Sequence, residues 1–202
     1  MNNTWPTDML VGAVRALQEE VTHRAEQHRF MATVCVPGCN HCCRWPVAAS
    51  MTEGMVLVKW LISNRLWTTS LQERVRNAAN IVAGLSYDVW RCADIPCPLL
   101  ADNGMCMTWP ARPIACRLSA SVGPPAMCHP HMLPEATGIV PVADSITDFR
   151  IREAAILGTQ GIKLTTMPLP VAILVAARIL NEKLAPEQVD AVILSEYAGR
   201  VL

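Results

Sequence analysis

Nine cysteines stand in this chain of 202 residues, and all of them lie between Cys35 and Cys128. The first group is Cys35, Cys39, Cys42 and Cys43, with a Pro-Gly pair inside its first gap. These short spacings, with a turn between them, let several sulfur atoms gather around one point. Soft thiolate ligands of this kind select zinc, iron-sulfur clusters or Cu(I) rather than magnesium or calcium. The sequence therefore predicts a metal centre.

A second group of cysteines follows in a segment rich in proline. It comprises Cys97, Cys106, Cys116 and, further on, Cys128. Residues 102–104 read Asp-Asn-Gly, a strong turn signal that predicts a short hairpin between residues 99–100 and 105–107. Such a hairpin would return Cys106 to Cys97. A lone buried cysteine is often only a small apolar core residue, but two groups of four are enough for two four-thiolate sites.

Composition and charge exclude several classes of protein. The chain has 17 Lys plus Arg against 17 Asp plus Glu, and 51% of its residues are apolar, which excludes wholesale disorder. A zero net charge without basic clusters predicts that it binds no nucleic acid and no anionic membrane. The longest apolar stretch, residues 171–177, is far shorter than the ~20 residues that span a bilayer. Tryptophans come without interleaved basic residues, which also argues against nucleic acid.

Cellular location bears on what nine thiols can do. The first eight residues lack the basic and apolar segments of a secretory signal, so we expect a cytoplasmic protein. In a reducing cytosol a disulfide framework is not expected, which leaves metal ligation or thiol catalysis. An odd count means that at least one cysteine does something else.

The elements that position the cysteines are expected to be helices. Apolar residues recur at spacings of three and four over 8–30, with Asp8 as N-cap. A second helix is expected over 52–66, and a third from Ser70, with Glu73 completing a capping box, to about residue 84. Three more are expected over about 145–157, 169–183 and 186–197, the first with a cap pattern at Ser145 and the last opening on a proline.

The segment between Cys92 and Pro141 holds nine prolines and cannot form a long helix. The expected fold class is therefore mainly α, a helical bundle enclosing an irregular cysteine-rich metal-binding insert with at most a short β-hairpin. We expect a single domain over 1–202. Within it, residues 8–86 carry the N-terminal helices and first cysteine group, 92–141 the insert, and 145–202 the C-terminal helices.

The cysteine pattern resembles a known family. Cys35-x3-Cys39-x2-Cys42-Cys43 is followed by Cys97, the Asp-Asn-Gly turn, Cys106, Arg112-Pro113 and Cys116-Arg117, and the whole is similar to the YkgJ-like cysteine-cluster family, described as a zinc- or iron-chelating domain. The resemblance covers about residues 35–128. It implies eight metal-ligating cysteines, which are Cys35, Cys39, Cys42, Cys43, Cys97, Cys106, Cys116 and Cys128. Cys92 is then the surplus one.

Relatives in that family include flagellin lysine N-methylases, which join such a domain to methyl transfer from S-adenosylmethionine. This chain departs from the usual pattern in two ways. It carries Trp109 where an aromatic such as tyrosine is common, and an unusually long stretch separates its two cysteine groups. The helices after Ser145 lie outside the resemblance, so the resemblance implies no activity for them.

The spacing of the cysteines bears on whether the metal is zinc or an iron-sulfur cluster. Only Cys39-Asn-His-Cys42 has the Cys-x2-Cys form common in zinc sites. The spacing from Cys35 to Cys42 equals that of radical enzymes that hold a 4Fe-4S cluster and bind S-adenosylmethionine, but those enzymes need a large α/β barrel that this chain does not predict. Cysteine ligation of a cluster needs no barrel. We favour an iron-sulfur cluster, 4Fe-4S by preference, with Zn²⁺ as the alternative, in one or two centres.

Other side chains are candidates for supporting roles. Arg112 and Arg117 are expected to contact ligand sulfurs and offset their charge, although solvated surface arginines are an equal alternative. His41, His129 and His131 are alternative ligands that eight cysteines make unnecessary. A nucleophile built on Cys92 and a histidine lacks any triad signature. Two tryptophans that closely follow cysteines, Trp45 and Trp109, are expected to wall the site from water.

The expected function is therefore metal binding, with redox or S-adenosylmethionine-linked methyl-transfer chemistry as its use. The alternative is a zinc-stabilised interaction module without catalysis, whose metal replaces a missing core. The sequence leaves open whether the protein is an enzyme, and which substrate or protein partner it has.

Overall fold

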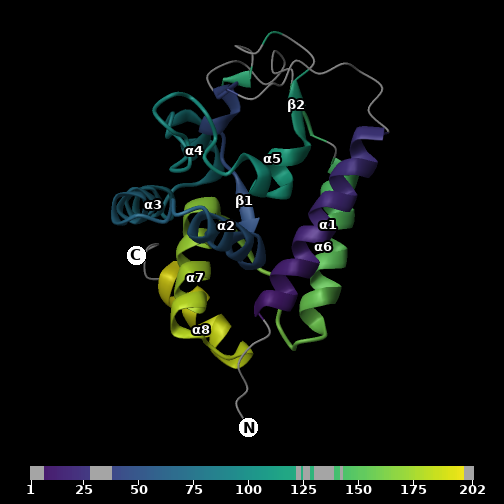
Figure 1. The fold of residues 1–202 in the computed structure, drawn as a ribbon. Coiled ribbons are helices and arrows are strands. Elements are labelled where there is room, and N and C mark those ends of the chain that lie inside the picture. The colour runs from purple at the N-terminus through teal and green to yellow at the C-terminus, as the bar shows by residue number, and fades with distance from the viewer. Residues whose placement is uncertain are drawn as a thin grey trace.

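The computed structural model describes residues 7–27, 38–121, 124, 128–129, 139–141 and 143–197. This part of the chain is mainly helical, as expected (Figure 1). Its helices are α1 (Thr7–Gln27), α2 (Met51–Ser63), α3 (Thr69–Val82), α4 (Tyr87–Cys92), α5 (Ile114–Leu118), α6 (Ala143–Gly158), α7 (Leu169–Glu182) and α8 (Pro186–Tyr197), with 3-10 turns η1 (His41–Arg44) and η2 (Trp109–Ala111). None of the described helices is both long enough and apolar enough to cross a membrane.

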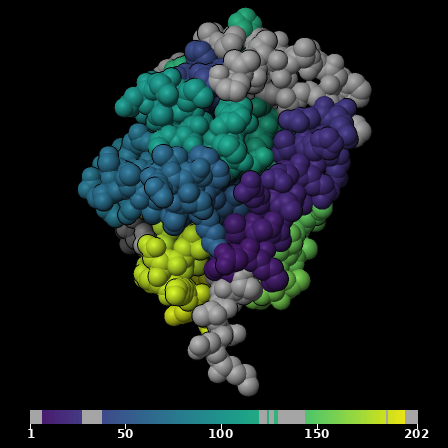
Figure 2. Space-filling view, in the orientation of Figure 1, coloured from purple at the N-terminus to yellow at the C-terminus, as the bar shows by residue number. Residues whose placement is uncertain are grey.

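Helices α2 and α7 form the centre of the core. The residues of α7 from Leu169 to Ile173 are all buried, because this helix packs against α2, α3 and α8. Gly54 of α2 permits the close crossing, since a Cβ there would collide with the carbonyl of Ala172 and lie 3.0 Å from the Cβ of Ala176. Helix α1 packs against α2 and runs beside α6 (Figure 1). In the space-filling view, α1 and α3 occupy one face, with α8 below them (Figure 2).

Most helices lie close to where the sequence predicts them, but α1, α2, α3 and α6 begin one or two residues before the predicted start. Asp8 lies inside the first turn of α1, where its carboxylate pairs with Lys59 of α2 rather than capping the helix. The N-cap of α3 is Thr68, whose hydroxyl accepts from the amide of Leu71, so the capping box expected at Ser70 is wrong. Ser145 lies within α6. A capping box does form elsewhere, at Ser50 at the start of α2.

Short strands tie the helices together. Strand β1 (Ala48–Ser50) pairs antiparallel with β4 (Thr166–Pro168), and β2 (Ser119–Ser121) pairs antiparallel with β3 (Ile139–Pro141). These pairs were not anticipated from the sequence. The expected hairpin is present as a single bridge between Leu100 and Cys106, with Gly104 at φ 79° in its turn.

Candidate metal centre

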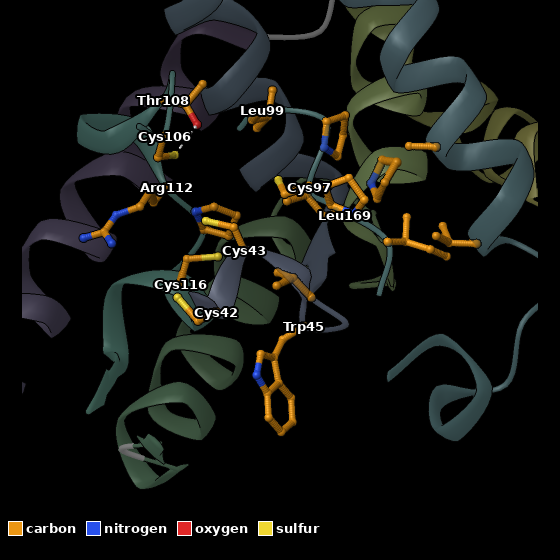
Figure 3. A pocket seen from close by; sticks show the side chains of 18 of the residues that line it. Cys42, Cys43, Trp45, Cys97, Leu99, Cys106, Thr108, Arg112, Cys116 and Leu169 are labelled. Carbon is orange, nitrogen blue, oxygen red and sulfur yellow. Dashed lines mark hydrogen bonds between the residues drawn. The ribbon is translucent and has the colours of Figure 1, made fainter. Parts of the chain in front are cut away.

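Cysteines from three separate segments of the described chain line one pocket (Figure 3). Turn η1 and the residues before it supply Cys39, Cys42 and Cys43, the hairpin supplies Cys97 and Cys106, and α5 supplies Cys116. None of the six is in a disulfide, and the cavity has a volume of about 70 Å³. The structure thus brings together six of the eight cysteines that the resemblance implies as ligands.

The two cysteine groups are joined through their backbones. The amide of Cys97 donates to the carbonyl oxygen of Cys43 at 2.7 Å, which places the start of the hairpin against turn η1. The hairpin turn also packs closely against the first group, because a Cβ on Gly104 would lie 2.9 Å from Nδ2 of Asn40. Glycine is favoured at position 104 chiefly for its positive φ, and the Asn40 side chain would have to move to admit a Cβ there.

The sulfur atoms lie near enough to perturb one another. A hydrogen bond with Cys43 and then burial raise the pKa of the Cys42 thiol. Burial raises the pKa of Cys97 to about 12, with Cys106 and Cys42 adding to the effect. Figure 3 shows the side chains of Cys42, Cys43 and Cys116 close together in the pocket. At neutral pH the thiols of Cys42 and Cys97 are protonated unless a cation is introduced among them.

The thiol of Cys116 has the most crowded surroundings. Its pKa is raised well above the usual thiol value, first by burial and then by the proximity of Cys97, Cys42 and Cys106. Negative charges on neighbouring sulfurs disfavour the thiolate form of Cys116. Cysteines from all three segments therefore lie close enough to Cys116 to raise its pKa.

Arg112 and Arg117, the two expected supporting arginines, have different positions. Arg112 lines the pocket, and its positive charge acts to lower the pKa values of Cys42 and Cys116. Its guanidinium carbon lies 3.5 Å from the ring centroid of Trp109 and extends away from the labelled sulfurs in Figure 3. Arg117 donates instead to the carbonyl oxygens of Arg112 at 2.8 Å and Pro110 at 2.6 Å. It therefore holds the loop that carries Arg112.

Aromatic and aliphatic side chains complete the wall of the pocket. Trp45 and Trp109 both line it, as expected. The indole of Trp45 donates to the carbonyl oxygen of Cys128 at 2.6 Å. The remaining wall is largely apolar and is formed by Val47, Ala78, Val82, Trp90, Ile95, Pro96, Pro98, Leu99, Pro113, Leu169 and Pro170. This wall limits the access of water to the thiols.

The remaining candidates lie elsewhere. Cys128 is 4% exposed, bonds to Trp45 through its carbonyl oxygen, and is not among the residues that line the pocket. Cys92 is exposed at the end of α4 and does not line the pocket either. The Nε2 atom of His129 lies 3.3 Å from Asp94, and His41 belongs to η1 without lining the pocket. Two further candidates, Cys35 and His131, lie outside the described residues.

Sequence reasoning missed a group of buried charges next to the cysteines. Glu53, Arg150 and Glu153 come together in the interior, and both carboxylates are fully buried. The capping pattern Ser50-x-x-Glu53 was the signal that could have marked the first of these carboxylates. The pattern does not indicate that the same carboxylate also accepts from the amide of Ile114 in α5, 61 positions away.

The cysteines line the pocket without forming a ready-made metal site. Within the described residues, no three histidine, cysteine, aspartate or glutamate side chains are grouped so as to hold a metal ion as they stand. Compared with known proteins, the chain matches no family model, no curated protein and no solved structure. Membership of the YkgJ-like family therefore stays a proposal that rests on the cysteine pattern.

Proposed function

We propose that this protein binds a thiophilic metal centre, an iron-sulfur cluster by preference, in the pocket lined by the six cysteines. One observation carries the proposal, namely that cysteines from η1, the hairpin and α5 converge on a single cavity. Core packing alone gives no reason for cysteines from three segments to meet in one place. The proposal assigns the irregular segment 92–141 as the metal-binding insert of a helical protein.

The chemistry of the donor set suits such a centre. Burial holds the thiols of Cys97 and Cys116 in their protonated form, and a bound cation would displace those protons and bring the sulfurs to the metal as thiolates. The positive charges of Arg112 and Arg74 would offset part of the negative charge of a polythiolate centre. Because the sulfurs are not grouped at ligand distance as they stand, binding includes rotation of cysteine side chains.

The ligand set of the proposal remains the eight cysteines that the resemblance implies. Six of them line the pocket, and Cys35 and Cys128 would complete the two groups of four that two centres need. The use of the centre in redox or S-adenosylmethionine-linked methyl transfer rests on the resemblance alone.

The alternative is a zinc-stabilised interaction module in which Zn²⁺ replaces a missing core. The packing of the insert weakens this alternative. Leu99, Ile114 and Leu118 are at most 1% exposed and belong to the main hydrophobic core, so the described part of the insert shares the core of the helices. A metal held in an already packed pocket favours a chemical role over a purely structural one.

The decisive experiment is anaerobic purification of the full chain, followed by a visible absorption spectrum and by analysis of metal and acid-labile sulfide. The proposal expects iron and sulfide in comparable amounts and a brown protein. A colourless protein with stoichiometric zinc and no sulfide would refute the iron-sulfur assignment in favour of Zn²⁺. A protein that takes up neither iron with sulfide nor Zn²⁺ after reduction and reconstitution would refute both.

A further inference from the structure

A buried group of charges lies directly behind the helix that carries Cys116. We call Glu53, Arg150 and Glu153 the buried charge cluster. The Nη1 atom of Arg150 lies 2.6 Å from Oε2 of Glu53 and 2.8 Å from Oε2 of Glu153. One guanidinium therefore serves two carboxylates that water does not reach. Buried ionised groups persist only where hydrogen bonds satisfy them, so each oxygen needs its donors.

The two carboxylates have different additional partners. Oε1 of Glu53 accepts from the backbone amide of Ile114 at 2.6 Å and from Nε2 of Gln18 at 3.2 Å. Its Oε2 accepts from the amide of Ser50 at 3.0 Å. The Oε1 atom of Glu153 accepts from the hydroxyls of Ser50 and Thr52, each at 2.5 Å. Among the described contacts, Glu53 is thus the member of the cluster that bonds to the backbone of α5.

The amide that Glu53 binds has no acceptor in its own helix. Ile114 is the first residue of α5, where no earlier turn supplies a carbonyl. The preceding N-cap residue is Pro113, whose side chain makes no capping hydrogen bond. The carboxylate of Glu53, in helix α2, accepts the hydrogen bond from this amide and so acts as the cap of α5. Cys116 follows two residues later on the same short helix, so the position of its sulfur depends on this hydrogen bond.

We infer that Glu53 is a positioning residue for the metal centre, one that orients Cys116 by holding the start of α5. The inference rests on the proposed function in that Cys116 is taken as a ligand. The carboxylate form is needed, because all four partners of Glu53 donate hydrogen atoms. A glutamine at position 53 must direct its own NH₂ group at donors whichever way its amide lies.

The test compares Glu53→Gln with Glu153→Gln in the full chain. Both substitutions remove one buried carboxylate from Arg150, so both are expected to lower stability. Only the first changes the group that accepts from the backbone of α5. We expect E53Q to weaken Zn²⁺ binding by roughly 10-fold to 100-fold, measured by competition with a chelator, and E153Q to change it by less than about 3-fold.

A second readout needs no metal. Alkylation by iodoacetamide of the metal-free, reduced protein is followed by mass spectrometry of the peptides that contain Cys116 and Cys97. We expect E53Q to raise the ratio of the alkylation rate at Cys116 to the alkylation rate at Cys97 by roughly 10-fold. E153Q should leave this ratio unchanged. Equal effects of the two variants on the ratio, or no change in E53Q, would overturn the assignment of a positioning role.

Failure of metal binding and failure of the positioning role give different results. If the wild-type chain takes up neither Zn²⁺ nor iron, the proposed function fails, while the alkylation ratio still decides whether Glu53 orients Cys116. If E53Q does not fold cooperatively, Glu53→Asp replaces it. Aspartate keeps the charge opposite Arg150 but withdraws its oxygens from the amide of Ile114 by one methylene. The same selective rise at Cys116 is then expected, and its absence would refute the inference.

Discussion

The amide of Cys97 donates a hydrogen bond of 2.7 Å to the carbonyl oxygen of Cys43, which joins the two cysteine groups through their backbones. A backbone hydrogen bond constrains position without using either side chain. Both sulfurs therefore stay available while the segments that carry them are held in place. The bond also explains how a pocket lined by cysteines can exist without any disulfide among them.

Replacement of single cysteines should separate ligands from the surplus thiol. We expect Cys97→Ser to lose most of the bound metal, because Cys97 lines the pocket and its hydroxyl replacement is a poor ligand for soft metals. Cys92→Ser is the matched control, since Cys92 is exposed and lies away from the pocket. Metal content per chain after anaerobic purification is the measurement. Equal losses in the two variants would show that the ligand set is wrong.

Thiol reactivity in the metal-free protein should depend steeply on pH at Cys97. Its pKa of about 12 leaves a thiolate fraction on the order of one in ten thousand at pH 8. Each further pH unit raises that fraction about tenfold until the pH reaches the pKa. The rate of alkylation at Cys97 should therefore rise about 100-fold between pH 8 and pH 10. A rate that levels off below pH 9 would contradict the raised pKa.

The contact between α1 and α6 should weaken in acid. Glu20 of α1 accepts from the two terminal nitrogens, Nη1 and Nη2, of Arg152 in α6, at 2.8 and 2.6 Å. It also accepts from Arg24 at 2.6 Å. These hydrogen bonds, that of Arg152 foremost, lower the pKa of Glu20 to about 2. The stabilising effect is present above the usual carboxylate pKa and is lost as the pH falls from about 4.5 to about 2.

Denaturant unfolding of Glu20→Gln across that pH range tests this expectation. The variant should be less stable than wild type at pH 6, and most of the difference should be lost near pH 2, where about half of the wild-type carboxylate is protonated. Glu19→Gln is the control, because Glu19 pairs within α1 with Arg15 and both side chains are exposed. A difference between wild type and E20Q that stays constant down to pH 2 would refute the ion-pair explanation.

Two glycines in helices should respond oppositely to alanine. Gly54→Ala places a Cβ against the carbonyl of Ala172 at the crossing of α2 and α7, so we expect a loss of about 1–3 kcal/mol in the free energy of unfolding. Gly12→Ala in α1 meets nothing within 4 Å and should stabilise the protein by about 0.5–1 kcal/mol. Denaturant unfolding of both variants is the measurement. A stabilising G54A would mean that the two helices cross further apart.

Local sequence signals predicted the six longer helices of the described chain well, but they did not predict the short helices α4 and α5 or the strands β1 to β4. The last helix, residues 186–197, has the predicted bounds, and the helix predicted over 169–183 ends one residue earlier. The starts of other helices were less accurate, because several side chains near one helix end can act as caps. Thr68 and Ser70 both carry the required hydroxyl, and it is Thr68 that accepts from the amide of Leu71. Local sequence does not distinguish the two.

By itself, the sequence determined the helical periodicity, the tight turn at Gly104, and the type and spacing of the cysteines, because each of these depends on residues within a few positions of one another. Only the tertiary structure decided which cysteines meet in one pocket and that the indole of Trp45 bonds to the backbone of Cys128. It also decided that the carboxylate of Glu53, at the start of α2, holds the start of α5. These relations arise from packing between segments distant in the chain, where burial makes each hydrogen bond and each charge matter more than it does in water.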